Sequence, residues 1–260
     1  MICYVSPLLA RARVAHGFST REGGISSAPF NSLNLGNPHN SPLLDDHQNI
    51  RENYRRLQLS LGMNGLDRCW VHQVHGGDVV FVRSGHEFSS GAKADALVSD
   101  DPARVVSVRV ADCVPILMAT EDGKVVAAVH AGWRGVVANV VPTAIREMRR
   151  MSDAPLLAAI GPCIGADSFE VGPEVLEQFV LLFGPDGPSR ANGGGKGHID
   201  LRRAVELQLL AAGLTADRID MTDRCTYRDA PEFYSHRRDR GVTGRMAALI
   251  APRAATSTSA

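Results

Sequence analysis

The amino-acid sequence predicts a mixed α/β (α+β) fold in a single domain. Segments with the alternating pattern of strands and segments with helical periodicity both recur along the chain. No linker rich in proline or serine separates them, and 44% of the 260 residues are apolar, which suffices for a substantial core. We therefore expect one domain at residues 1–253 and a small polar tail at 254–260 that is disordered.

In the first half of the chain we expect a loop, a helix and three strands. Residues 16–37 are rich in glycine and asparagine, as is typical of a loop. Residues 45–61 place apolar side chains at helical spacing, with Asp45 and Asp46 as candidate caps. Valine-rich or alternating apolar segments predict the strands, at residues 79–82, 106–110 and 114–119.

The second half begins with residues 125–129, which are apolar throughout and predict a strand buried on both faces. A helix is expected at 135–150, where Pro142 should kink or restart it. Further along, Asp200 is a candidate helix cap and Gly213 a candidate helix end. The remaining expected elements are a strand at 156–160, helices at 173–183 and 201–213, and a flexible loop at 184–197.

The charges of the chain balance, because Lys plus Arg count 28 and Asp plus Glu count 28. A dedicated nucleic-acid binder needs an excess of positive charge, so this class is disfavoured. The N-terminus lacks the features of a signal peptide, and no apolar stretch approaches the ~20 residues that span a bilayer. We expect a soluble cytoplasmic protein whose five cysteines are thiols, ligands or nucleophiles rather than disulfides.

Reactive side chains concentrate in residues 69–76, 110–115 and 129–135. Cys113 lies between two expected strands, and His130 lies at the end of the strand buried on both faces. Ligand sites of α/β sheets form at such strand ends. One thiol and two imidazoles suit zinc or copper, and three protein ligands are typical of a catalytic metal site.

The choice of histidine from the first segment stays open on spacing alone. His72 and His75 would share one face of a helix but lie on opposite faces of a strand, whereas Cys69 and His75 would share a strand face. The separations of these residues from Cys113 and His130 match no short zinc motif, and a buried cysteine is most often a small hydrophobic residue.

Arginines recur near hydroxyl groups at residues 19–21, 235–239 and 243–245. Their guanidinium groups match the geometry of phosphate, although a solvated basic loop would have the same composition. Cys163, in a tight turn after an expected strand, has no adjacent base, which favours a packed thiol over a nucleophile.

Ten short strings follow one another in a fixed order. They lie at residues 16–21, 30–36, 73–76 (QVHG), 94–96, 111–113 (ADC), 130–135 (HAGWRG), 160–165, 170–172, 223–227 and 237–239. Together they resemble the laccase-domain or polyphenol oxidase family, whose members are also described as purine nucleoside phosphorylases and peptidoglycan editing factors. The resemblance implies a four-layer α/β/β/α fold with mixed sheets, shared with a bacterial toxin deamidase domain.

The resemblance also implies a zinc ion, or copper, held by the histidine of QVHG, the cysteine of ADC and the histidine of HAGWRG. In this sequence they are His75, Cys113 and His130. The resemblance thereby selects His75 over His72. His236 departs from the family pattern, which more often has tyrosine there, and this difference concerns substrate packing.

The implied activities are phosphorolysis of adenosine, inosine, guanosine and 5′-methylthioadenosine, and deamination of adenosine. Phosphorolysis requires an oriented phosphate, a role that we assign to Arg21 with Arg134 or Arg237. Asn34 is placed with the substrate-binding residues. Asp112, adjacent to a ligand, is assigned as a proton shuttle or as the carboxylate that orients a histidine. The expected partners are purine nucleosides and phosphate, without nucleic acid or membrane, for a monomer or weak homodimer.

Three alternative functions compete with this interpretation. A copper-dependent polyphenol oxidase of the multicopper type needs many more ligands than one cysteine and a few histidines provide. A metal-free hydrolase would use Cys113 as nucleophile and His130 as base, and metal analysis separates it from the zinc enzyme. A non-enzymatic factor in cell-wall maintenance would keep its cellular effect when the site residues are replaced.

Overall fold

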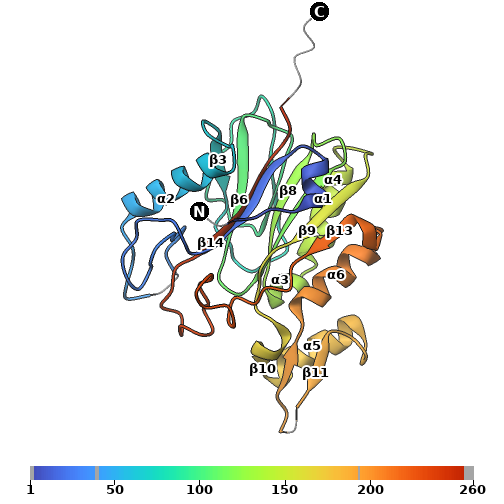
Figure 1. Cartoon of the computed structure of the whole chain (residues 1–260). Helices are drawn as coiled ribbons and strands as arrows, with labels where there is room; N and C mark the ends of the chain where they lie inside the picture. The colour runs from blue at the N-terminus through green and yellow to red at the C-terminus, as the bar shows by residue number, and fades with distance from the viewer. Residues whose placement is uncertain (1–2, 39–40, 193, 255–260) are drawn as a thin grey trace, which may run out of the picture.

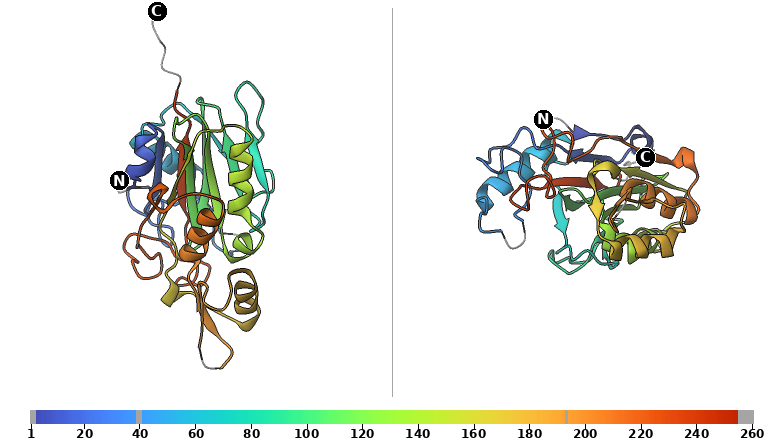
Figure 2. Two further views of the ribbon diagram at one scale, coloured as in Figure 1. Left: turned by 90° about the vertical axis from the view of Figure 1, so that its right-hand side faces the viewer. Right: turned by 90° about the horizontal axis from the view of Figure 1, so that it is seen from below.

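The structure is a computed structural model that describes residues 3–38, 41–192 and 194–254. Two β-sheets lie face to face at its centre, and helices cover both outer faces (Figure 1). The two further views in Figure 2 show the same stacking of sheets between helices. This arrangement confirms the expected four-layer α/β/β/α fold with mixed sheets.

The first sheet has five strands and carries both ends of the described chain. Its neighbouring strands are antiparallel except for the last pair, which is parallel. In spatial order the strands are β1 (Cys3–Tyr4), β2 (Ala15–Ser19), β14 (Met246–Ala251), β6 (Arg104–Val110) and β3 (Asp67–Trp70).

The second sheet has six strands, of which the outer pair at each edge is parallel and the inner pairs are antiparallel. In spatial order they are β13 (Ile219–Met221), β9 (Leu156–Ile160), β7 (Val114–Thr120), β8 (Val126–Ala131), β5 (Ala96–Ser99) and β4 (Val79–Val82). A small third sheet projects at the bottom of Figure 1, formed by β10 (Glu170–Val171), β12 (Gly197–Ile199) and β11 (Ser189–Ala191).

Three buried clusters of apolar side chains hold the layers together. Between the sheets, residues such as Val108 and Leu117 interlock. Helix α2 (His47–Ser60) buries Tyr54 and Leu57 against the first sheet. Burying one such large apolar side chain contributes about 1.5–3 kcal/mol. The second sheet is covered by α3 (Trp133–Val137), α4 (Val140–Arg149), α5 (Pro173–Phe183) and α6 (Leu201–Ala211), and the short elements are α1 (Pro7–Arg11), η1 (Ala166–Ser168) and η2 (Ala216–Arg218).

The elements with strong periodicity form where the sequence predicts them. The strands at 79–82 and 156–160 and the helix at 173–183 are confirmed to the residue. Helix α2 begins after Asp46, whose side chain accepts the Gln48 N–H. Helix α6 begins after the predicted cap, and the chain leaves it through a glycine with φ of 90° at position 213.

The helix expected at 135–150 is interrupted and restarts, as predicted, but the break lies before Pro142. The chain forms α3 and α4, separated at Asn139, which adopts the left-handed conformation with φ of 58°. Pro142 lies within the first turn of α4, where its missing N–H would have no helical partner in any case. The interruption therefore precedes the proline instead of lying at it.

Two expected loops contain strands. Residues 15–19 form β2 in the middle of the first sheet, although 16–37 was expected to be a loop. Gly17 is there for close packing, because a Cβ atom would lie 2.6 Å from Cδ2 of Leu61. Within the expected loop at 184–197, β11 forms and pairs with β12, with Ser189 opposite Ile199. The expected tail at 254–260 lies, apart from Ala254, outside the described residues.

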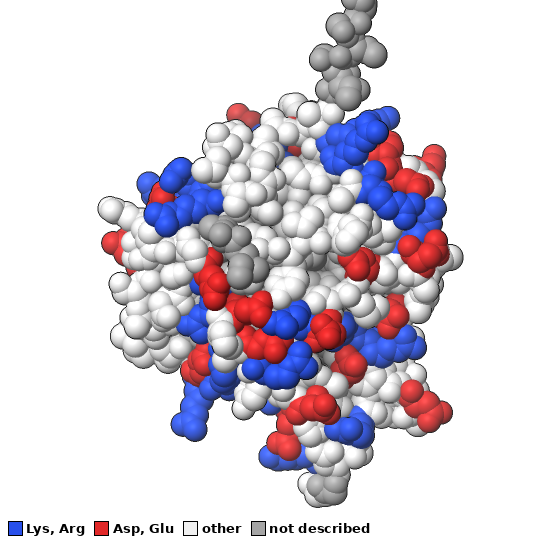
Figure 3. All heavy atoms as spheres, viewed as in Figure 1, with Lys and Arg blue, Asp and Glu red and all other residues white. Residues whose placement is uncertain are grey.

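Charged side chains of both signs are interspersed on the face shown in Figure 3. That face has no large field of one sign, in keeping with the balanced composition. Within the described ranges, no helix combines the length and the apolar character needed to cross a membrane.

Candidate metal centre and active-site pocket

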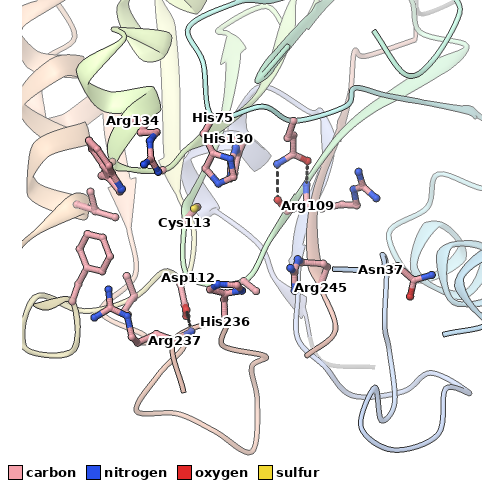
Figure 4. Close-up of a pocket in the computed structure, with 17 residues that line it drawn as sticks. Asn37, His75, Arg109, Asp112, Cys113, His130, Arg134, His236, Arg237 and Arg245 are labelled. Atoms are coloured by element: carbon pink, nitrogen blue, oxygen red, sulfur yellow. Dashed lines mark hydrogen bonds between the residues drawn. The ribbon is translucent and has the colours of Figure 1, made fainter. Parts of the chain in front are cut away.

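Three side chains from separate segments meet where the inner strands β7 and β8 of the second sheet come together at one end. His75 follows β3, Cys113 lies between β6 and β7, and His130 lies near the end of β8 (Figure 4). Their ligand atoms lie within 4.8 Å of one another, and the two imidazole rings meet edge to face. The structure thus brings together the three residues that the resemblance selected. Among the described residues they form the one group found with this metal-binding geometry.

The local chain explains how these side chains approach so closely. His130 is paired with Pro115 across β7 and β8, which fixes it beside the turn that carries Cys113. Gly132, just beyond β8, leaves the space that the cluster occupies. A Cβ atom there would lie 2.9 Å from Cδ2 of His75 and 3.0 Å from Sγ of Cys113. The glycine of the HAGWRG string is therefore required by the geometry of the site.

Asp95 accepts hydrogen bonds from both histidine residues of the cluster. Its fully buried carboxylate accepts the Nδ1–H of His130 at 2.8 Å and the backbone N–H of His75 at 2.9 Å. It also accepts the N–H of Gly76 at 2.6 Å, which stabilises the left-handed conformation of His75, with φ of 61°. Burial opposes the charge of Asp95, but these hydrogen bonds outweigh burial and lower its pKa. Because Nδ1 of His130 is engaged, Nε2 is the nitrogen available to a metal.

Asp112 has a different role from the orientation of a histidine. Its carboxylate accepts the Thr226 hydroxyl at 2.6 Å and the backbone N–H of Arg237 at 2.7 Å, and it makes no hydrogen bond to a histidine among the described residues. It ties two C-terminal loops to the turn that holds Cys113. Sequence reasoning chose Asp112 for its adjacency to a ligand and missed Asp95, whose one signal was its place in the string at 94–96.

The electrostatics of the cluster favour a charged thiolate. Burial raises the pKa of Cys113, but the charge and hydrogen bond of His130, together with those of His75, outweigh burial and lower that pKa to about 6. Burial likewise favours a neutral His130, whereas Cys113 and Asp95 raise the pKa of its ring to about 9. A thiolate with two imidazoles, one oriented by a carboxylate, fits a zinc-type or copper-type ion.

The cluster lies in the wall of a pocket of about 370 Å³. Figure 4 shows Arg134 and Arg237 on one side of the cluster and Arg109, Arg245 and Asn37 on the other. The first side is its aromatic end, where Trp133 and Phe169 also line the pocket. The guanidinium of Arg134 stacks on Trp133 at 4.2 Å, and that of Arg237 lies 5.1 Å from the centre of the Phe169 ring. We call the opposite side, formed by Arg109, Arg245, Asn37 and Gln73, the arginine end.

Not every residue assigned to the site from the sequence reaches this pocket. Arg134, Arg237 and Asp112 line it, whereas Arg21 and Asn34 are absent from its lining. Arg21 donates to the carbonyls of Asn31 and Ala230 and stacks on Tyr234 at 4.5 Å, a structural arrangement. The Asn34 side chain is fully buried and accepts the backbone N–H of Arg245, so it positions that residue.

The other candidates of the first segment lie outside the cluster. Cys69 packs between the two sheets, and the backbone of His72 pairs with that of Lys93 in an isolated β-bridge. His236 lines the pocket, where burial and then the charge of Arg245 lower the pKa of its imidazole. Arg109 was missed, because its alternation with valines predicts only a strand.

Known proteins resemble this chain over nearly its whole length. A model of the family described as multi-copper polyphenol oxidoreductase laccase matches residues 15–253. The purine nucleoside phosphorylase YfiH of Escherichia coli strain K12 is 38% identical over 239 residues, covering 91% of this chain and 93% of that protein. The crystal structure of YlmD from Geobacillus stearothermophilus has a TM-score of 0.85 at 33% identity, covering 96% of this chain and 94% of that one. The chain therefore belongs to the multi-copper polyphenol oxidoreductase laccase family.

Proposed function

We propose that this protein is a zinc-dependent purine nucleoside phosphorylase that accepts adenosine, inosine, guanosine and 5′-methylthioadenosine. The observation that carries the proposal is the position of the His75, Cys113 and His130 cluster between an aromatic and a cationic end of one pocket. A purine base suits aromatic walls, and phosphate suits arginine. The names of the relatives from Escherichia coli and Deinococcus radiodurans support the same reaction, the latter being 35% identical over 249 residues.

In this reaction a phosphate oxygen forms a bond to C1′ of the ribose while the bond from C1′ to the purine nitrogen breaks. The contribution of the protein is to hold both reactants at the cluster. A zinc ion on the three side chains would supply Lewis-acid chemistry towards an oxygen of the substrates. Asp95 keeps His130 in the orientation and tautomer that this requires.

At the aromatic end, Trp133 and Phe169 would stack against the purine. The guanidinium groups of Arg134 and Arg237 lie over these rings, which restricts their movement and leaves their N–H groups to donate to substrate atoms. Nη1 of Arg237 already donates to the carbonyl of Glu170 at 2.7 Å, which restricts this side chain further. We assign Arg134 and Arg237 to substrate binding on this basis.

Deamination of adenosine is the second activity that we propose for the same pocket. It requires a water molecule as nucleophile and a group that carries a proton to the leaving ammonia. Asp112 lines the pocket beside the cluster, so it is the carboxylate that we propose for proton transfer.

The direct test is an assay of zinc-loaded protein with adenosine and inorganic phosphate, followed by identification of the products. Adenine and ribose 1-phosphate are expected, and inosine would report deamination. Neither product with any of the four nucleosides would overturn the proposal. Cys113→Ala should remove both activities, and Cys163→Ala is the matched control, because Cys163 lies away from the cluster in the core.

Phenol oxidation by a cluster of several copper ions is disfavoured by the same geometry. Within the described ranges a single group of three ligands was found, and a multicopper centre needs many more. Copper-loaded protein should therefore fail to oxidise phenols at a rate that competes with phosphorolysis. A metal-free cysteine hydrolase is tested by metal analysis of freshly purified protein, because it predicts full activity without bound metal.

A further inference from the structure

Two cations line the arginine end of the pocket without an ionic partner among the described residues. Arg109 belongs to β6, and Arg245 is the residue just before β14. The side chains of both line this end of the pocket. The two strands are neighbours, with Arg109 opposite Ala247, two residues after Arg245, so the pairing of the sheet directs both arginines to the same face. Neither guanidinium forms an ion pair with any residue of the described ranges.

The backbone holds Arg245 while leaving part of its guanidinium for a ligand. Its N–H donates to Oδ1 of Asn34 at 2.9 Å, and its Nη1 donates to the carbonyls of Thr243 and Gly244, each at 3.0 Å. Nε and Nη2 donate to no acceptor in the described part of the chain. These bonds fix the direction of the side chain, and the two other donor atoms are left over.

The side chain of Arg109 is held by packing, and its backbone is held by hydrogen bonds. The Gln73 side chain bonds both backbone groups of Arg109, at 2.7 and 2.8 Å. The arginine side chain passes over Gly36, where a Cβ atom would lie 2.8 Å from its Cδ, and its guanidinium lies 5.7 Å from the centre of a Trp70 ring. Its N–H groups donate to no acceptor among residues 3–38, 41–192 and 194–254.

The charges at this end call for an anion. Burial lowers the pKa of Arg245 and the neighbouring charge of Arg109 adds to this, whereas the charges of Cys113 and Asp112 act in the opposite direction. The carboxylate that lines the pocket, Asp112, is already engaged by a hydroxyl and a backbone N–H. The arginines of the aromatic end differ, because Arg134 and Arg237 are exposed to solvent, whereas Arg109 and Arg245 are half-buried. A compact oxyanion at the arginine end would satisfy the unused donors and the excess charge together.

We propose that Arg109 and Arg245 form the phosphate subsite of this pocket, in place of Arg21. The inference rests on the proposed phosphorolysis in that it takes inorganic phosphate as the co-substrate. It orients the reactants, with the purine at the aromatic end, C1′ of the ribose in front of the cluster and phosphate on the opposite side. The proton of hydrogen phosphate then balances the reaction by ending on the released purine.

Binding of inorganic phosphate without nucleoside tests the subsite separately from turnover. The measurement is calorimetric titration of phosphate into zinc-loaded protein. We expect Arg109→Gln and Arg245→Gln each to weaken binding about tenfold to a hundredfold, as for hydrogen bonds to a charged group. Arg134→Gln removes the same charge at the aromatic end and should leave phosphate binding within about twofold. Arg11→Gln, on the exposed end of α1, is the control for net charge.

Steady-state kinetics distinguish failure of the subsite from failure of the proposed function. If the wild type catalyses phosphorolysis but Arg134→Gln alone raises the KM for phosphate, the subsite is wrong and the function stands. If phosphate binds in an Arg109- and Arg245-dependent way without phosphorolysis, the subsite stands and the function is wrong. No phosphate binding by the wild type overturns the subsite. Arg245→Lys, which keeps the charge, covers the case in which Arg245→Gln does not fold.

Discussion

Two cysteines at neighbouring strand ends of the second sheet have opposite chemistry. Cys113 precedes β7, is half-buried and faces two histidines, which lower its pKa to about 6. Cys163 follows β9, the neighbour of β7, and is fully buried among apolar side chains, where burial raises its pKa to about 12. The residue type and the place in the sheet are alike. The surrounding side chains therefore decide whether a thiol is a ligand or a packed core residue.

The backbone of the cysteine in the core still supports the site indirectly. Cys163 pairs with Cys225 through an isolated parallel β-bridge of the backbone, while both thiols are free, and the Cys163 carbonyl accepts the N–H of Thr226. Thr226 in turn donates its hydroxyl to Asp112, beside Cys113. One cysteine thus belongs to the reactive cluster, and the other helps to hold the loop that supports it.

The largest effect is expected from removing each thiol in turn. Cys113→Ala should abolish zinc binding and phosphorolysis, because it removes the one charged ligand of the cluster. Cys163→Ala should retain a single zinc ion per chain and most of the activity. Elemental analysis and a nucleoside assay of both variants check this. Full phosphorolysis by a metal-free Cys113→Ala protein would show that Cys113 is not a required ligand and does not differ from Cys163 in this respect.

The carboxylates near the cluster allow the next test. Asp95→Asn should weaken zinc binding about 10–100-fold, because the side chain that orients His130 loses its charge. Asp112→Asn should change zinc affinity much less, because its carboxylate bonds Thr226 and Arg237 instead of a histidine. Competition with a chelator of known affinity measures both. A larger loss of affinity in Asp112→Asn than in Asp95→Asn would restore the assignment made from the sequence.

Stability should respond in the opposite order from zinc binding. Cys163→Ala leaves a small cavity in a closely packed core and should lower the free energy of unfolding by about 1–2 kcal/mol. Cys113→Ala in metal-free protein should have a smaller effect, since this side chain is half-buried in a pocket wall. Urea unfolding of both variants without metal gives the two values. Equal destabilisation would mean that the thiols are packed alike.

The smallest effect concerns a buried histidine that, unlike His130, makes no hydrogen bond to a carboxylate among the described residues. His16 donates from Nδ1 to the Val14 carbonyl and accepts the Ser6 N–H at Nε2, and burial lowers the pKa of its ring. The unfolded chain therefore binds this proton first, so stability should fall as pH drops below about 6.5. His16→Gln should flatten the pH dependence of unfolding, and an unchanged slope contradicts the prediction.

The sequence predicts the fold better than the site, for a physical reason. Periodic apolar patterns are local, so strands such as 156–160 and helices such as 173–183 are predicted to the residue. The sequence does not predict strand β2, because Gly17 indicates a loop. In the structure this glycine packs closely against Leu61. The site depends on contacts between distant segments, which local patterns do not encode.

Asp95 illustrates this limit of local patterns. It acts on His130 only because β5 pairs with β8, with Ala96 opposite Val129. Arg109 and Arg245 likewise meet through the pairing of β6 with β14. Cys113 and His130 are singled out by their places at expected strand ends, whereas the choice of His75 depends on the resemblance to the family.

The central claim is that the cluster of His75, Cys113 and His130 binds the metal on which nucleoside phosphorolysis depends. Titration of zinc into metal-free protein, with release of purine followed in the presence of phosphate, tests it most directly. Activity should rise in proportion to added zinc and reach its plateau at a single ion per chain. Full activity before any zinc is added, or zinc binding with no gain in phosphorolysis, would contradict it.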